Sequence, residues 1–201
     1  MKALQVLSIN QINKNFINEY LKLICDWERI AYGENLHRHP AQLLEWIHVN
    51  GSGFLCCVDN GETLLGYADL WAIEDTLYDS LKAGLTLEEE VPSSSLLDPH
   101  QTLTAKNWYI GSIITDPHLR DHSPETSRNA FRAIRYGMSN YFAKLYTYPA
   151  EVLGVGSSKK GQDILTRWNF KPVDMAPHPV DTRPRYRLTL NSAEDALFFR
   201  G

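Results

Sequence analysis

The segment from Trp108 to Ile134 constrains the fold of this chain more than any other. It begins as an apolar strand, WYIGSIIT, which breaks at Asp116-Pro117, and an arginine-containing loop and a helical pattern follow. In an open α/β sheet, a junction of this kind is where main-chain amides and a helix N-terminus can hold an anionic ligand. Two interpretations therefore stand: a phosphate-binding loop, or an ordinary strand-to-helix turn.

The composition is that of an ordinary globular protein. The 201 residues are 43% hydrophobic and 22% charged, which predicts a single domain over residues 1–201. The formal net charge of -4 argues against a broad nucleic-acid surface. No stretch approaches the roughly 20 apolar residues of a membrane span, and the N-terminus lacks the apolar core of a signal peptide. We therefore expect a cytoplasmic protein with no nucleic-acid or membrane partner.

The cysteines and histidines do not indicate a metal site. Cys25, Cys56 and Cys57 form neither a disulfide framework nor a CxxC spacing. His118 and His122 are four residues apart, but they lie beside Pro117 and lack the HExxH pattern. We expect reduced, buried thiols and no bound metal.

Apolar periodicity predicts the elements. A helix is expected over 12–30, and two apolar runs over 53–60 and 63–73 predict a hairpin. An irregular segment at about 75–105 looks like an insertion. The resulting order predicts an α/β (α+β) fold with a mixed sheet and helices on both faces. The other expected elements are strands over 4–10, 108–115, 150–156, 169–175 and 185–190, and helices over 39–50, 157–168 and from 123 or 126 to 145.

Two phrases give the chain a resemblance to the Gcn5-related N-acetyltransferase (GNAT) superfamily. SIITDPHLR is similar to the core-strand phrase x-V-x-P-x-x-R, with Thr115, Pro117 and Arg120 at the matching positions. VLGVGSSKKGQDILTRWNF is similar to the strand, turn and helix that end in G-F, here Asn169-Phe170. The resemblance covers roughly residues 53–173 and implies a mixed, largely antiparallel twisted sheet.

The resemblance also implies a coenzyme A thioester, acetyl-CoA or another acyl-CoA, as co-substrate. The core strand would pair with the pantetheine arm, and the loop after it would hold the pyrophosphate at the helix N-terminus. A serine at the start of the last helix would contact the cofactor arm. The implied cofactor-binding residues are Ile113, Ile114, Thr115, Arg120, His122, Ser123, Thr126, Ser157 and Ser158.

The chain departs from the family pattern at several positions. The family loop R/Q-x-x-G-x-G/A is RDHSPETS here, without glycine and with carboxylates at Asp121 and Glu125. Leu165 stands where the family often has a tyrosine that protonates the thiolate, and Gly111 where many members have a glutamate base. Ser123-Pro124-Glu125 also fits an ordinary helix start, so the loop keeps both interpretations.

Proton transfer would therefore need other groups. Asp69 alternates with Tyr67 and Trp71, so we expect these three side chains on one face of a strand. Histidine has a pKa suited to accepting a proton near neutrality. Of the side chains considered, the candidate catalytic residues are Asp69, Tyr109 and His118, with Tyr67 and His122 as further possibilities.

Three hypotheses for function follow. The first is an acyl-CoA-dependent N-acyltransferase that acts on a small-molecule or peptide amine by proximity and backbone polarisation. The second is a catalytically inactive GNAT-fold binding or regulatory module, whose insertion would contact another chain or a second copy in a homodimer. The third is a transferase that takes its acyl group from a carrier protein, because the acidic loop disfavours free coenzyme A.

Overall fold

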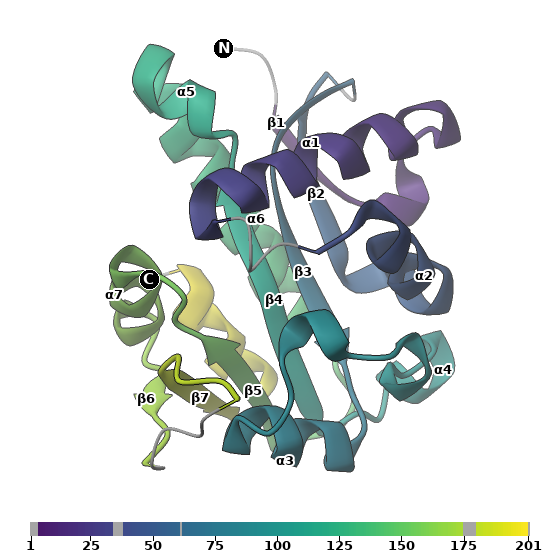
Figure 1. The fold of residues 1–201 in the computed structure, drawn as a ribbon, viewed down its shortest axis with the longest axis vertical. Helices are drawn as coiled ribbons and strands as arrows, with labels where there is room; N and C mark the ends of the chain where they lie inside the picture. The colour runs from purple at the N-terminus through teal and green to yellow at the C-terminus, as the bar shows by residue number, and fades with distance from the viewer. Residues whose placement is uncertain (1–3, 34–37, 61, 175–179, 201) are drawn as a thin grey trace.

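The structure, a computed structural model, describes residues 4–33, 38–60, 62–174 and 180–200 (Figure 1). Its strands form one seven-stranded sheet in the order β1-β2-β3-β4-β5-β7-β6. Neighbours are antiparallel except β4 and β5, which are parallel. This confirms the mixed, largely antiparallel sheet. The strands are β1 (Leu4–Ser8), β2 (Phe54–Asp59), β3 (Thr63–Ala72), β4 (Asn107–Thr115), β5 (Ala150–Val155), β6 (Lys171–Pro172) and β7 (Arg185–Leu190).

Helices cover both faces of the sheet, as predicted. Figure 1 shows α1 crossing one face, whereas α6 runs along the other. Short 3-10 segments link several elements. The helices are α1 (Lys14–Tyr32), α2 (Pro40–Asn50), α3 (Asp75–Ala83), α4 (Pro99–Thr102), α5 (Pro117–His122), α6 (Pro124–Phe142) and α7 (Lys159–Arg167). The 3-10 segments are η1 (Ile9–Gln11), η2 (Gly51–Gly53), η3 (Glu88–Glu90), η4 (Ser93–Ser95) and η5 (Ala193–Arg200).

The first face buries the apolar side of α1. The Asn13 side chain accepts a hydrogen bond from the Asn15 amide and begins the helix, and Gly33 ends it with a φ of 90°. Only glycine adopts such a φ without strain, which explains why the helix ends at this residue. The buried side of α1 faces strand residues such as Phe54 and Tyr67, whose rings stack 5.5 Å apart.

The second face is built on α6. Ala130, Ile134, Met138 and Phe142 are fully buried and recur at helical spacing. Phe199 of η5 stacks on Phe142 with ring centroids 5.3 Å apart, so the C-terminal segment completes this core. α6 ends at Phe142, whereas the predicted helix continued to residue 145. β6 is shorter than the strand predicted over 169–175.

The segment at 75–105 folds back onto the sheet. It leaves the end of β3 through α3 and returns through η3, η4 and α4. An isolated bridge joins Ile73 to Leu96, and the Leu97 amide donates to the Ala72 carbonyl at 2.9 Å. Leu81 and Val91 are buried in the first core. The segment is therefore anchored against the same face as α1.

Candidate functional site

The two halves of β4 have different neighbours. Its first half pairs with β3 on one side and with β5 on the other, the last β5 pair being Ile110 with Gly154. Beyond that pair β4 continues to Thr115, whereas β5 ends at Val155. Over residues 111–115, β3 is therefore the only neighbour among the described strands, and it pairs with Ile113, Ile114 and Thr115. We call this stretch the open edge.

Strand alternation decides which main-chain groups face the open side. The Asp116 amide donates to the Leu65 carbonyl of β3 at 3.0 Å. The main-chain N–H and C=O groups of successive residues point to alternate sides of a strand. Those of Ile114 therefore also point to β3, whereas those of Ile113 and Thr115 point to the open side. Two of the three predicted pantetheine-binding residues thus direct their main-chain groups away from β3.

A β-bulge lies where the open edge begins. Gly111 and Ser112 of β4 together face Asp69 of β3, because the register shifts between Ala68 and Leu70. The Ser112 amide donates to the Asp69 carboxylate instead of to a β3 carbonyl. A Cβ on Gly111 would lie 2.8 Å from Asp69 Oδ2 and 2.9 Å from Arg38 Nη1. Glycine is required here because buried charged groups occupy the space of a side chain.

Those charged groups form a cluster around Arg38, which we call the Arg38 cluster. Arg38 is 2% exposed and forms ion pairs with Glu28 of α1 and with Asp69. Its backbone amide also donates to Glu28 Oε2 at 3.1 Å. Glu88 of η3 completes the cluster, with Oε1 3.4 Å from Arg38 Nε. Three carboxyl groups therefore share one guanidinium.

Neutral side chains satisfy most of the remaining oxygens. The Tyr67 hydroxyl and the Ser112 hydroxyl donate to Glu28 Oε1 at 2.5 and 3.0 Å. The Trp71 indole donates to Asp69 Oδ2 at 2.9 Å. The expected common face of Tyr67, Asp69 and Trp71 is thus confirmed: all three side chains reach the Arg38 cluster.

The three carboxyl groups differ in proton affinity. Burial raises the pKa of Glu28, but the Arg38 guanidinium and hydrogen bonds from Arg38 and Tyr67 outweigh it and hold the pKa below its usual value. Burial raises the pKa of Asp69 despite Arg38. Burial also raises the pKa of Glu88 to about 8, and the negative charges of Asp69 and Glu28 add to the rise. Glu88 is the group poised to exchange a proton near neutrality.

Glu88 lies beside Tyr109, the predicted catalytic residue on β4. The Tyr109 hydroxyl donates to Glu88 Oε2 at 2.8 Å. Glu88 Oε1 is buried and has no hydrogen-bond donor among the described residues. Tyr109 pairs with Leu153, one step before the strands separate. Tyr109 and Glu88 thus lie next to the start of the open edge.

Arg183 links this site to the start of α7. It forms an ion pair with Asp181, with Nε 2.8 Å from Oδ1. Its Nη1 donates to the Ser157 hydroxyl at 3.4 Å, and its charge interacts with Tyr109 and Glu88. The predicted Ser157 therefore belongs to the same neighbourhood. The Ser158 hydroxyl instead accepts from the Gly161 amide at 3.1 Å and caps α7.

The predicted loop after β4 is a short helix. The Asp116 side chain accepts from the His118 amide at 2.9 Å, and Pro117 occupies the first turn, so α5 forms immediately after the strand. The Ser123 amide donates to the Leu119 carbonyl at 2.8 Å. Of the two interpretations, the ordinary helix start is the one observed: Ser123 joins α5 to α6, Pro124 begins α6 and Glu125 lies in its first turn.

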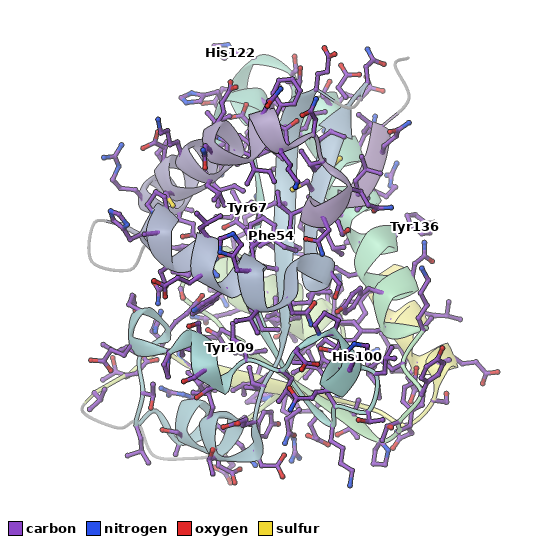
Figure 2. All side chains as sticks on the ribbon, turned by 90° about the vertical axis from the view of Figure 1, so that its right-hand side faces the viewer. Phe54, Tyr67, His100, Tyr109, His122 and Tyr136 are labelled. Atoms are coloured by element: carbon purple, nitrogen blue, oxygen red, sulfur yellow. The ribbon has the colours of Figure 1, made fainter. Side chains whose placement is uncertain are left out.

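The remaining predicted residues lie at this end of the sheet. Arg120 and His122 are exposed on α5, and Thr126 lies in the first turn of α6. The Thr115 hydroxyl lies 3.1 Å from the Ser127 hydroxyl, which ties the start of α6 to the end of the open edge. Figure 2 shows His122 at one end of the long axis and Tyr109 in the opposite half of the molecule.

The structure brings only some of the catalytic candidates together. Asp69 and Tyr109 both contact the Arg38 cluster, whereas His118 is exposed on α5. Sequence reasoning missed Glu28, Arg38 and Glu88. For Glu28 a signal existed, because it lies four residues after buried Ile24 on the apolar side of α1.

Arg38 and Glu88 had no such signal. Arg38 precedes α2 outside any periodic pattern, and the LEEEV segment that contains Glu88 reads as solvated. Only the folded chain brings these two residues to β3 and β4.

Among the described residues, no helix combines the length and apolarity that crossing a membrane requires. In the same parts of the chain, no group of three or more His, Cys, Asp or Glu side chains is placed to hold a metal ion. The Arg38 guanidinium occupies the centre of the three buried carboxyl groups.

Comparison with known proteins supports the fold. No protein-family description and no curated protein sequence matches the chain. Three solved structures align over most of it. SsHAT is 14% identical with a TM-score of 0.54, covering 93% of this chain and 98% of that one. GphF, a GNAT-like decarboxylase in complex with isobutyryl-CoA, is 12% identical with a TM-score of 0.53 and the same coverage.

The third, FeeM, is an N-acyl amino acid synthase from uncultured soil microbes. It is 11% identical with a TM-score of 0.53, covering 97% of this chain and 93% of that one. At these identities the likeness shows the fold alone. The chain has the fold of the Gcn5-related N-acetyltransferases, as the two sequence phrases implied.

Proposed function

We propose that this protein transfers an acyl group from a pantetheine thioester, such as an acyl-CoA, to an amine. The open edge of β4 carries this proposal. A strand with unpaired main-chain groups at Ile113 and Thr115 can add one more extended segment, and the amide-containing pantetheine arm is such a segment. The isobutyryl-CoA bound to GphF, which shares the fold, supports this class of donor.

Acyl transfer requires one proton acceptor near the open edge. The incoming ammonium must lose a proton before its nitrogen attacks the thioester carbonyl carbon. Glu88, with a pKa of about 8, is matched to that step. The Tyr109 hydroxyl holds the carboxyl group in place through its 2.8 Å hydrogen bond.

The nitrogen then forms the amide bond as the carbon–sulfur bond breaks. The second proton of the nitrogen passes to the departing thiolate, so the products are an amide and a thiol. Leu165 has no proton to give: it is buried, and its Cδ2 lies 3.1 Å from the Cβ that Gly154 lacks.

The test is binding of acetyl-CoA and isobutyryl-CoA, measured by isothermal titration calorimetry. Ile113→Pro removes an amide that faces the open side, whereas Ile114→Pro removes one that faces β3. We expect Ile113→Pro to weaken binding at least tenfold with the circular dichroism spectrum retained. Ile114→Pro should instead lower the melting temperature sharply. No heat of binding with well-folded wild-type protein at millimolar thioester would overturn the proposal.

A second candidate function is that of a binding module without catalysis. Two observations favour it. The amides of His118 in α5 and of Ser123, which follows α5, are already bonded. The 75–105 segment exposes Leu85 at 53% and Leu103 at 42%. Light scattering of the wild type and of Leu85→Asp/Leu103→Asp would reveal self-association through this surface. Self-association lost in the variant, together with no thioester binding, would favour the module.

A further inference from the structure

Charge is unevenly distributed along the chain. Residues 117–172 contain nine basic residues (Lys and Arg) and four acidic residues (Asp and Glu). The whole chain contains 20 basic and 24 acidic residues. This span holds α5 to α7, the helices that follow the two separating strands. The cations of this acidic protein are therefore enriched in the part of the chain that follows β4.

The exposed cations of α6 and α7 form what we call the basic flank. On α6, Arg128 and Arg132 are one turn apart and exposed, and Glu125 is the one carboxylate of that helix. No ion pair within the described residues involves either arginine. On α7 the exposed members are Lys159, Lys160 and Arg167, of which Lys159 is paired with Asp163.

The basic flank borders the open edge. Arg128 directly follows Ser127, whose hydroxyl lies 3.1 Å from that of Thr115 at the end of the edge. Lys159 begins α7 four residues after β5 ends at Val155. Phe131 of α6 stacks on Trp168 just past α7, with ring centroids 6.0 Å apart. This ring contact connects α6 to the end of α7.

Carboxylates gather beside the far end of the open edge, on the side of α1. Between α1, the start of β3 and α5 lies a cavity of about 320 Å³ whose charged lining is acidic: Glu19, Asp26, Glu62 and Asp116. Asp121 and Glu125 are exposed on the adjoining turns. A diphosphate there would be repelled by these carboxylates and would find the α5 amides already bonded.

The geometry points to a carrier-borne donor: the acyl group arrives on the phosphopantetheine arm of an acidic carrier protein that docks on the basic flank. This inference rests on the proposed acyl transfer and names the source of the thioester. Such an arm brings a single phosphate, whereas coenzyme A adds a diphosphate and a further phosphate. The carrier's acidic surface complements Arg128 and Arg132. Tyr136, four residues after Arg132 on α6, is exposed and adds apolar contact area; Figure 2 shows it at the surface of the molecule.

The experiment compares three thioesters that share one acyl group. S-isobutyryl-pantetheine, isobutyryl-CoA and a purified acidic acyl carrier protein loaded with isobutyrate are titrated into the intact chain. We expect the loaded carrier to bind at least tenfold more tightly than isobutyryl-CoA. Raising the salt concentration from 50 to 300 mM should weaken carrier binding severalfold and leave the pantetheine thioester unaffected.

Charge-reversal variants locate the docking surface. Arg128→Glu/Arg132→Glu should weaken carrier binding at least tenfold and leave S-isobutyryl-pantetheine unchanged. Lys14→Glu/Lys22→Glu reverses two exposed cations on α1 and should have little effect. Both double variants change the net charge equally, so a general electrostatic effect would affect them alike and would overturn the assigned surface.

The outcomes separate this inference from the proposed function. If isobutyryl-CoA binds as tightly as the loaded carrier, the carrier inference fails and acyl transfer stands. If the carrier without its arm binds as tightly as the loaded form, the flank does not serve donor delivery and the inference also fails. If none of the three thioesters binds, the proposed function itself fails.

Discussion

The two halves of β4 show how one strand serves two purposes. Residues 107–110 pair on both sides, and Trp108 there is fully buried against Tyr141 and Phe142. Over residues 111–115, β3 is the only neighbour among the described strands. The paired half is held by the strands beside it. The open half has no described strand on its other side. We therefore expect it to be stabilised by the Arg38 cluster, which packs against Gly111 and Ser112.

The largest expected effect comes from removing this support. Arg38→Met leaves the buried carboxyl groups of Glu28 and Asp69 without a cation, which should lower the free energy of unfolding by about 3–5 kcal/mol. Urea denaturation measures this change. Lys159→Met is the matched control, because its ion pair with Asp163 is largely exposed, and it should change stability by less than about 1 kcal/mol. Equal effects would show that the open half stands without the cluster.

Substitution of Gly111 addresses the contact between the open half and the cluster. In Gly111→Ala the added Cβ meets Asp69 Oδ2 at 2.8 Å, so the ion pair must shift, at a cost of about 1–3 kcal/mol. Gly161→Ala in α7 is the control: its Cβ meets only the Ser158 hydroxyl, at 3.3 Å. A thermal melt of both variants measures the difference. A melting temperature of Gly111→Ala equal to that of the wild type would contradict the close contact between Gly111 and the Arg38 cluster.

The protonation of Glu88 predicts a pH dependence. The folded protein keeps this proton up to about pH 8, whereas the ordinary value for the group is 4.5. The contribution of protonated Glu88 to the free energy of unfolding is thus fully present below about pH 4.5, and it is lost as the pH rises through 8. Between pH 5.5 and 8.5, the wild type should lose on the order of 2 kcal/mol more stability than Glu88→Gln.

Chemical denaturation at both pH values measures this difference. Glu90→Gln, at an exposed position of the same segment, should follow the wild type. If wild type and Glu88→Gln lose stability in parallel, Glu88 does not carry the proton assigned to it.

The smallest expected effect concerns the tip of the open half. Thr115→Val keeps the shape of the side chain but removes the hydroxyl that faces Ser127. We expect a loss of about 0.5–1.5 kcal/mol, the usual range for one hydrogen bond. Hydrogen exchange should show faster opening of the first turn of α6, with the paired half of β4 unchanged. Faster exchange at Trp108 as well would indicate that the two halves open together.

The sequence predicted the sheet, because periodicity and turn residues report local structure directly. The alternation of Tyr67, Asp69 and Trp71 placed three side chains on the correct face. The phrase from Ser112 to Arg120 located the open edge. These signals are local, so one chain read alone contains them.

The rest of the site depends on contacts between distant segments. Arg38 reaches Asp69 across 31 residues of chain, and Tyr109 reaches Glu88 across 21. No periodic pattern marks either pair, since Arg38 lies in a connection and Glu88 in the insertion. The helix α5 was missed for a different reason: the family phrase suggested a loop where Asp116 and Pro117 begin a helix.

The position of Glu88 outside the core sheet has a consequence for how this chemistry can evolve. The candidate proton acceptor belongs to a segment that leaves β3 and returns to β4, so its replacement leaves the order of the strands intact. Descendants of this chain could exchange that segment and acquire a new reactivity or lose it, while inheriting the same scaffold. Mutational libraries confined to 85–92 would exploit the same separation.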